Sequence, residues 1–445
     1  MPNPLHLDGT LVRPADAGYD EARTIWNGMV DRKPALIAQC ASTRDVVSAV
    51  NHAREHGLVV AVRGGGHNVA GNAVCDDGLV IDLRPMKDVS VDPKARIAIA
   101  GGGVTWGEYD AATQAHGLGS PGGAISSTGI AGLTLGGGFG WLSRSYGLAC
   151  DNLISAEVVT ATGDVLTASE TENTDLFWAL RGGGGNFGVV TKFGYRLQVI
   201  PELLAGLVLH PRSEAPGVIE AYRRMTVAAP DALSSMAAFL CSPDGDPVVG
   251  AFSVFHGSVD EAPAALTEWR AHGTALVDDM GLKPYALVQQ AFDAGFPSGM
   301  RNYWKSGYIR SMTPEFMATL IEHANRAPTP QCVVGLEHMI GGAVGRVGAS
   351  ETAFGRRDAE YNLLILGVGT DPSTDDAVRD WVRTMAEAIQ PFGTGALYVN
   401  YMDQDEPNRI ADAYGAEHYA RLGQIKKRYD PANLFRMNQN IAPAG

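Results

Sequence analysis

Glycine residues gather in clusters along the first 190 residues, and this clustering constrains the fold more than any other feature of the sequence. The chain has 445 residues, of which 54 are glycine. Dense glycine lowers the intrinsic stability of helices and strands, so it marks turns or places where a ligand approaches the backbone closely. Several clusters in one segment therefore predict a large ligand that contacts several loops. The clusters are Gly64–Gly66, Gly101–Gly103, Gly122–Gly123, Gly136–Gly138 and Gly182–Gly185.

The first cluster follows the apolar run Leu58–Val62, which has the pattern of a buried strand. Its backbone N–H groups are free of side chains and can receive a phosphate. His67 comes directly after the glycines, where it could act on whatever the loop holds. A surface turn with an unrelated histidine is the alternative, and the loop alone does not decide between them.

Size and charge exclude several classes of protein. A chain of 445 residues is too long for one core and predicts two or three domains. The net charge of -14 leaves no basic surplus for a nucleic-acid partner. No run of eighteen apolar residues predicts a membrane span, and Met1–Pro14 has no signal-peptide core. Five single cysteines without a CxxC pair suit a reducing compartment, so we expect a cytoplasmic protein; they are Cys40, Cys75, Cys150, Cys241 and Cys332.

Hydrophobic periodicity predicts alternating helices and strands up to about residue 200. Ser42 is a helix cap and Gly57 a helix stop, with Val46, Val50 and Ala53 at helical spacing between them. We also expect helices at Trp106–Ala112 and Asp175–Leu180, and strands at Leu79–Leu83, Arg96–Ala100, Val158–Ala161 and Val189–Phe193.

Glycine becomes sparse after Pro201, and the pattern there predicts a second α+β domain with a sheet covered by helices. The expected helices are Pro216–Val227, Ser258–His272, Pro314–Ala327 and Thr374–Gln390. The expected strands are Ala237–Leu240, Val248–Phe255, Val333–Ile340 and Leu363–Val368.

Two motifs that suggest other chemistry have the wrong context. Gly183–Gly188 contains GxGxxG, but a helix precedes it and a strand follows, which reverses the order that a dinucleotide site needs. His52 and His56 are four residues apart on one helix without the acid that a zinc protease site needs, so a solvated helix face is preferred. We expect no metal site.

Tyr398-Val399-Asn400-Tyr401 places two tyrosines and an amide close together near the C-terminus. Tyrosines in strands usually pack against neighbours, and strand alternation would send these two to opposite faces. If both face one site, the strand must bend or end there. A tyrosine acting as a base near neutral pH needs its pKa lowered by about three units, which requires about 4 kcal/mol from nearby donors or cations.

Four stretches together carry a family resemblance. Pro34, Asp45-Val46, Val50, Val60 and Gly64-Gly65-Gly66-His67 have the spacing of a covalent-FAD motif, and Thr128–Asn152 contains a second FAD loop. The end of the family's FAD domain is matched by Asp175–Val190, and its C-terminal return by Tyr398–Tyr401 and Asn438–Ile441. The chain thus resembles the berberine bridge enzyme-like branch of the FAD-linked oxidases, in the vanillyl-alcohol oxidase superfamily, over essentially its whole length.

The resemblance implies an α+β fold with a two-part, PCMH-type FAD-binding domain. Residues 1–200 would form its first part, 201–395 an α+β substrate domain with an antiparallel sheet covered by helices, and 396–445 a return that completes the FAD domain and the active site. The residues expected to bind FAD are Arg63, Gly64, Gly65, Gly66, His67, Asn68, Thr128, Gly129, Gly132, Gly138, Gly140, Leu142, Gly188, Val190, Asn438 and Asn440.

His67 is implied to carry the flavin covalently, through the methyl group on the benzene side of its ring. Some relatives add a cysteinyl link, but Ile125 stands where that cysteine would be and Cys150 lies too far along the chain. We therefore expect a single covalent link.

The resemblance also implies that Tyr398 takes a proton from a substrate hydroxyl during hydride transfer to FAD, while Tyr401 assists by hydrogen bonding. The expected reaction is the oxidation of an alcohol, sugar or phenolic secondary metabolite, with O2 as acceptor. An amine oxidase of the 6-hydroxynicotine oxidase type is the alternative, although that relative lacks both tyrosines. Arg346 stands near an acidic base of some relatives, which argues against a carbon–carbon bridge-forming reaction.

Several questions stay open at this level. A net-neutral flavin-dependent cyclase and a flavin-bearing protein without turnover are further alternatives. Ile130-Ala131 lies near the face of the flavin where relatives control the access of oxygen. The size of these two residues does not decide between an oxidase and a dehydrogenase, and an oxidase is favoured. Asn302–Lys305 is the expected pocket stretch of the substrate domain. The small-molecule substrate and the oligomeric state cannot be named.

Overall fold

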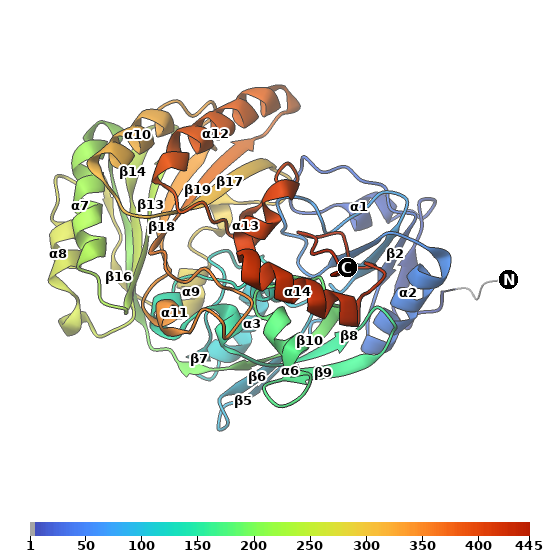
Figure 1. Ribbon diagram of the computed structural model, residues 1–445. Helices are drawn as coiled ribbons and strands as arrows, with labels where there is room; N and C mark the ends of the chain where they lie inside the picture. Colours follow the sequence, from blue (N-terminus) through green and yellow to red (C-terminus); the bar gives the residue numbers. More distant parts are fainter. Residues whose placement is uncertain (1–4) are drawn as a thin grey trace.

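The computed structural model describes residues 5–445 and places two groups of elements side by side (Figure 1). The first residues of Met1–Pro14, the segment expected to lack a signal-peptide core, lie outside the described part. The N-terminal blue-to-green elements and the red C-terminal helices lie together on one side of the view. The yellow and orange elements of the middle of the chain form a large sheet on the other side. Among residues 5–445, no helix combines the length and the apolar composition needed to cross a bilayer.

A small sheet of order β1-β2-β4-β3 holds the first glycine loop at its carboxyl edge. Strands β2, β4 and β3 run parallel, so the loop after β3 leaves the sheet at the same edge as the loop after β4. Helix α2 covers it, with Ser42 accepting a hydrogen bond from the Asp45 N–H and Gly57 in the left-handed conformation (φ 63°) at the end. The bounds are β1 (Thr10–Val12), β2 (Leu36–Gln39), β3 (Val60–Arg63), β4 (Leu79–Asp82), α1 (Tyr19–Arg23) and α2 (Thr43–His56).

A second, antiparallel sheet of order β5-β6-β10-β8-β9 carries the other glycine-rich loops. Its strands are β5 (Val89–Asp92), β6 (Ile97–Gly101), β8 (Leu153–Val159), β9 (Val165–Ser169) and β10 (Val189–Arg196), and β7 (Leu118–Gly119) pairs with β11 (Gln198–Val199) nearby. The helices are α3 (Trp106–Gln114), α4 (Ile130–Leu135), α5 (Ser143–Tyr146) and α6 (Thr174–Leu180), with a 3-10 turn at Ala149–Asp151.

The large sheet has the order β15-β12-β14-β13-β18-β19-β17, with β16 also paired to β12, and its neighbouring strands run antiparallel. Its strands are β12 (Leu203–Pro211), β13 (Leu233–Cys241), β14 (Pro247–Phe255), β15 (Val277–Asp278), β16 (Gly281–Lys283), β17 (Arg301–Ile309), β18 (Val333–His338) and β19 (Tyr361–Gly369). Helices α7 (Ala215–Val227), α8 (Ala264–Arg270), α10 (Pro314–Ala324) and α12 (Asp375–Ile389) cover one face (Figure 1). Short helices α9 (Tyr285–Gln289) and α11 (Ala343–Arg346) lie beyond the other face.

The C-terminal segment returns to the N-terminal half of the chain. Helix α14 (Ala416–Tyr429) packs beside α6, and α13 (Ile410–Tyr414) packs against α14. Lys426 is fully buried there, and its Nζ donates to Asp430 Oδ2, to Asn186 O and to Phe435 O at 2.7 to 2.9 Å. The return thus fixes both the loop before β10 and the last residues of the chain.

The predicted α+β class is confirmed, and most expected elements lie within two residues of their predicted ends. The expected helix Ser258–His272 is wrong as one element: Pro263 separates a 3-10 turn at Val259–Glu261 from α8, because proline has no N–H to continue a helix. Strands β12 and β17 were missed. Both are long members of the large sheet: β12 is an apolar run interrupted by Gly206, and β17 mixes apolar and polar residues without a clear period of two.

Candidate active site

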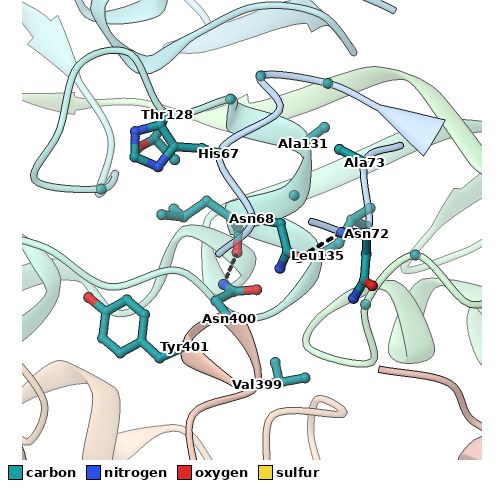
Figure 2. Close-up of a pocket in the computed structure, with 18 of the residues that line it drawn as sticks. His67, Asn68, Asn72, Ala73, Thr128, Ala131, Leu135, Val399, Asn400 and Tyr401 are labelled. Carbon is teal, nitrogen blue, oxygen red and sulfur yellow. Dashed lines mark hydrogen bonds between the residues drawn. The ribbon is translucent and has the colours of Figure 1, made fainter. Parts of the chain in front are cut away.

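One cavity of about 300 Å³ lies between the glycine loops of the N-terminal half and the large sheet. Its walls come from the loops after β3, before α4 and before β10, from strands β13, β17, β18 and β19, and from the C-terminal return. Figure 2 shows His67, Asn68 and Asn72 from the first loop on one side and Asn400 and Tyr401 from the return on the other. Residues from the whole length of the chain therefore meet in one space.

The loop after β3 and the loop before α4 contact each other through their main chains, at Gly65 and Gly129. A Cβ added to Gly65 would lie 2.4 Å from the Gly129 N atom, and one added to Gly129 would lie 2.3 Å from the Gly65 N atom. No side chain fits at either position, because real Cβ contacts are never this short. The close approach places His67 beside the start of α4 and leaves bare main chain facing the cavity.

His67 is held from two sides. Its ring stacks on Trp26 with the centroids 4.1 Å apart, and Ser127 Oγ lies 3.3 Å from Nε2. The surrounding protein desolvates the imidazole, and this burial lowers the pKa of His67 to about 4. The ring is therefore neutral at physiological pH and keeps a nitrogen lone pair.

Eleven of the residues expected to bind the cofactor line this cavity. They are Gly64, Gly65, Gly66, His67, Asn68, Thr128, Gly129, Gly132, Gly188, Val190 and Asn438. Residues outside the expected set also line it, among them Asn72, Phe139, Glu337 and Asn400.

Five expected cofactor residues do not line the cavity. The Arg63 side chain turns to Asp82, with Nη2 and Oδ2 2.7 Å apart and both groups buried, so it anchors the base of the loop. Gly138 donates its N–H to the Tyr398 hydroxyl, and a Cβ on Gly140 would lie 1.9 Å from Gly122 O. Leu142 is fully buried in the core, and Asn440 is partly buried. Arg63, Gly138, Gly140 and Leu142 support the walls of the cavity. The spacing of residues along the chain does not distinguish such a supporting residue from one that contacts a ligand.

The cavity fits a large polar cofactor such as FAD. Its glycine walls leave space for a flat ring system and offer backbone N–H groups at the start of α4. The side-chain oxygens of Asn438 and Asn440 are buried and have no partner among the described residues. Buried polar atoms without a partner are uncommon, so a bound group that supplies donors explains them.

Tyr398 and Tyr401 line the same cavity because the chain forms a 3-10 turn at Val399–Tyr401, and Figure 2 shows Tyr401 of this pair. Their ring centroids lie 4.8 Å apart in an edge contact. The Tyr398 oxygen accepts hydrogen bonds from Asn400 Nδ2 at 2.8 Å and from the Gly138 N–H at 3.1 Å. Burial nevertheless raises the pKa of Tyr398 above its usual value. Among the described residues no strand includes Tyr398 or Tyr401, and the turn brings both side chains to one site, as the shared-site alternative required.

Glu337 is the acidic group of this site, and sequence reasoning missed it. It lies near the end of β18, is 4% exposed, and accepts hydrogen bonds from Tyr401 Oη at 3.0 Å and Asn362 Nδ2 at 2.7 Å. Burial raises the pKa of Glu337 to about 7, although these two donors oppose the shift. A glutamate inside the apolar run Val333–Ile340 was the available signal.

The remaining sequence candidates have clear positions. Ile125 and Ala131 line the cavity, whereas Ile130 is buried in the core. Within the expected pocket stretch Asn302–Lys305, Trp304 lines the cavity. Arg346 pairs with Asp231 on the surface.

The two histidines of α2 stack on each other with centroids 4.0 Å apart. Residues 5–445 contain no group of three or more His, Cys, Asp or Glu side chains placed to hold a metal ion.

Known families match both ends of the chain. The family described as "FAD binding domain" matches residues 34–169, and the family described as "Berberine and berberine like" matches residues 397–442. These two segments contain the first glycine loops with His67 and the return with both tyrosines.

Relatives match the chain over its whole length. It is 32% identical to (R)-6-hydroxynicotine oxidase of Paenarthrobacter nicotinovorans, covering 100% of this chain and 99% of that protein. An FAD-linked oxidoreductase of Dictyostelium discoideum is 30% identical over 98% of this chain and 95% of its own length. The crystal structure of 6-hydroxy-D-nicotine oxidase from Arthrobacter nicotinovorans superposes with a TM-score of 0.90, at 31% identity and with 100% of both chains covered.

Proposed function

This chain belongs to the berberine bridge enzyme-like family of FAD-linked oxidoreductases, and from that premise we propose an oxidase that holds FAD covalently on His67 and oxidises an alcohol group of a small molecule. The observation that carries the proposal is the shared cavity. His67 and the glycine loops form one wall of it, while Tyr398, Tyr401 and Glu337 project into it from the opposite wall.

The surroundings of His67 support a covalent attachment point. Its pKa of about 4 keeps the imidazole neutral, and a neutral imidazole has the lone pair that a bond to the flavin methyl group requires. Trp26 and Ser127 fix the orientation of the ring. Ile125, at the position of the second link in some relatives, has no nucleophilic atom, so the proposal includes one bond only.

FAD bound here would supply a two-electron acceptor for a hydride from the substrate carbon, with O2 as the final acceptor and hydrogen peroxide as its product. The chain's own residues then have to remove one proton from the substrate hydroxyl. We assign this step to Tyr401 and Glu337, because the Tyr401 O–H donates to a carboxyl group that ionises near neutral pH.

A tyrosine that acts as a base near neutral pH needs nearby donors or cations that lower its pKa, and the environment of Tyr398 does not lower it. Two neutral donors contact its oxygen, and burial holds its pKa above the usual value. Burial raises the pKa of Tyr401 as well, but of the two tyrosines it is Tyr401 that donates to the Glu337 carboxyl group. We therefore propose that Tyr398 orients the substrate hydroxyl while Tyr401 passes the proton to Glu337. Both tyrosines stay catalytic residues in this scheme.

Oxidation of an amine is the second candidate. The observation that favours it is the Glu337 carboxyl, which would pair with a substrate ammonium group in a site that has no other acidic side chain in its wall. The printed name of the nicotine oxidase relative is in keeping with this alternative.

The direct test of the attachment is acid precipitation. Wild-type protein treated with trichloroacetic acid should keep its yellow flavin colour in the washed pellet, and His67→Ala should release the colour completely. His52→Ala, which changes a histidine on α2 away from the cavity, is the matched control and should keep the colour. A colourless wild-type pellet would show that the linkage is wrong.

The oxidase reaction is tested separately with the same preparation. A substrate should bleach the flavin when oxygen is absent, and admission of air should restore the colour with formation of one hydrogen peroxide per oxidised molecule. A flavin that bleaches but stays reduced in air would indicate a dehydrogenase, and conversion of the substrate without lasting bleaching would indicate a net-neutral reaction.

A further inference from the structure

The strands of the large sheet form an apolar wall of the cavity. Six residues, which we call the sheet wall, project into it from β13, β17, β18 and β19: Met236, Trp304, Val333, Glu337, Leu364 and Leu366. Glu337 is the one polar side chain of the six, and both of its oxygens already accept hydrogen bonds from the protein. The sheet wall therefore offers a bound molecule mostly hydrophobic contact.

Aromatic rings extend this apolar surface. The Trp304 ring meets Trp26 edge-on at 5.5 Å between centroids and Tyr401 at 5.9 Å. The Trp304 Nε1–H donates to Asn302 Oδ1, so its polar atom is satisfied inside the protein and does not need a ligand. Phe292 and Phe296 line the same cavity from the loop after α9.

We propose that the substrate of this site is a flat aromatic or similarly apolar ring compound with its oxidisable group as a single polar substituent. The ring would lie against Trp304 and the sheet wall, and the substituent would meet Tyr401 and Glu337. Aromatic rings gain from edge and stacked contacts of this kind beyond their buried area. The inference rests on the proposed oxidase function, because it concerns the substrate of that same site.

The same wall disfavours saccharides. A sugar ring carries a hydroxyl group on most of its carbons, and each buried hydroxyl without a partner weakens binding by about tenfold. The sheet wall has no free donor or acceptor for a row of hydroxyls, and polar lining residues such as Asn72 and Asn400 belong to the loops and the return instead, so two or more hydroxyls that face the sheet wall would stay unpaired. A small polyhydroxylated substrate should thus bind about 100-fold more weakly than an aromatic compound of similar size.

The experiment measures binding to the flavin-loaded enzyme without oxygen, through the change that a ligand makes in the flavin absorption spectrum. The probes are phenol, 4-hydroxybenzyl alcohol and benzylamine on one side, and glucose and xylobiose on the other. The aromatic probes should have dissociation constants at least 100-fold lower than the sugars. Sugars that bind as tightly as the aromatic probes, or aromatic probes that leave the spectrum unchanged at 10 mM, would overturn the inference.

Variants of Trp304 place the effect on the sheet wall. Trp304→Ala should weaken the binding of phenol at least tenfold and leave the sugars unchanged, whereas Trp304→Phe, which keeps an aromatic ring, should stay within threefold of wild type. The flavin spectrum and the melting temperature show whether each variant is folded. Equal binding of phenol to Trp304→Ala and wild type would remove Trp304 from the site.

The two proposals fail in different ways. The hydroxyl-bearing carbon of phenol carries no hydrogen and cannot give up a hydride, so the binding of phenol tests the substrate class alone. If phenol binds tightly but neither 4-hydroxybenzyl alcohol nor benzylamine bleaches the flavin, the oxidation of these groups is wrong and the aromatic site stands. If xylobiose bleaches the flavin and the aromatic probes do not bind, the oxidase stands and the aromatic site is wrong.

Discussion

Glu337 illustrates how a single residue acquires its properties from its surroundings. Its side chain is almost completely buried near the end of β18, an interior strand of the large sheet, and its two partners are the neutral groups of Tyr401 and Asn362. No cation among its hydrogen-bond partners compensates for the lost hydration, so burial dominates and the pKa rises to about 7. A carboxyl group with this pKa can accept a proton from Tyr401 at physiological pH and release it to solvent afterwards.

The rate of flavin reduction should follow the ionisation of Glu337. Below its raised pKa the carboxyl group is protonated and cannot accept the Tyr401 proton, so the rate should rise with pH through about 7 and become constant above it. Glu337→Gln should remove this inflection and lower the plateau by about 10² to 10⁴. Stopped-flow reduction of the flavin without oxygen, at pH 5 to 9, measures both effects.

Two tyrosine variants serve as the comparison. Tyr401→Phe should lower the rate and remove the inflection as Glu337→Gln does, because the proton no longer has a path to the carboxyl group. Tyr398→Phe should lower the rate but keep the inflection near 7. The reverse result, an inflection lost only in Tyr398→Phe, would return the role of base to Tyr398.

Two glycine loops pack against each other and together form the wall of the cavity that faces the cofactor. The loop after β3 and the loop before α4 meet at Gly65 and Gly129, where each main chain occupies the space of the other's missing Cβ. Gly132 has a different role, because a Cβ there would meet nothing within 4 Å. It lies inside α4 and lines the cavity, so its missing side chain leaves space for the ligand.

Alanine at these two glycines should therefore affect different properties. Gly129→Ala should destabilise the flavin-free protein by about 1–3 kcal/mol or more, because its Cβ overlaps the Gly65 main chain. Gly132→Ala should leave the flavin-free protein as stable as wild type or slightly more stable, since alanine is favoured in a helix by up to about 1 kcal/mol. Its flavin content should nevertheless fall.

Urea unfolding of the flavin-free proteins and the ratio of flavin to protein after purification measure the two effects. Gly18→Ala is the control, because a Cβ at that position in the exposed turn before α1 also meets nothing within 4 Å. Equal loss of stability in Gly129→Ala and Gly132→Ala would contradict the separation of roles.

At the scale of the whole molecule, the C-terminal return brings the two ends of the chain together. The tyrosine pair follows the large sheet in sequence, but it faces the loop of His67 because α13 and α14 pack back on the N-terminal half (Figure 1). Lys426 fixes this return through three charge-assisted hydrogen bonds inside the protein. Asp430 also accepts from the Leu434 and Phe435 N–H groups, so the ion pair holds the last turn of the chain.

Removal of the Lys426 charge should destabilise the protein strongly. Lys426→Met keeps the length of the side chain but leaves the Asp430 carboxylate buried without its cation, which typically costs about 3–5 kcal/mol. Lys427→Met, which changes the exposed neighbour, should stay within about 0.5 kcal/mol of wild type. Urea unfolding measures both, and similar values for the two variants would show that the buried pair does not hold the return.

The sequence by itself determined the local elements and the family. Helix α2 lies between its predicted cap and stop, because Ser42 and Gly57 act through groups close to them in the chain. The glycine clusters and the C-terminal tyrosines likewise identified the class of flavin-binding proteins. The conformational freedom of glycine and the spacing of motifs are local properties, which can be read along the chain.

Only the tertiary structure decided which residues share the site and with what chemistry. The pKa of Glu337, the turn of Arg63 toward Asp82 and the inclusion of Trp304 in the sheet wall all depend on neighbours that are distant in sequence. Burial and electrostatic partners are set by the packing of β17, β18 and the C-terminal return, so no pattern along the chain contains them. The physical reason is that desolvation and hydrogen bonding act through space, whereas periodicity and spacing describe only the order of residues.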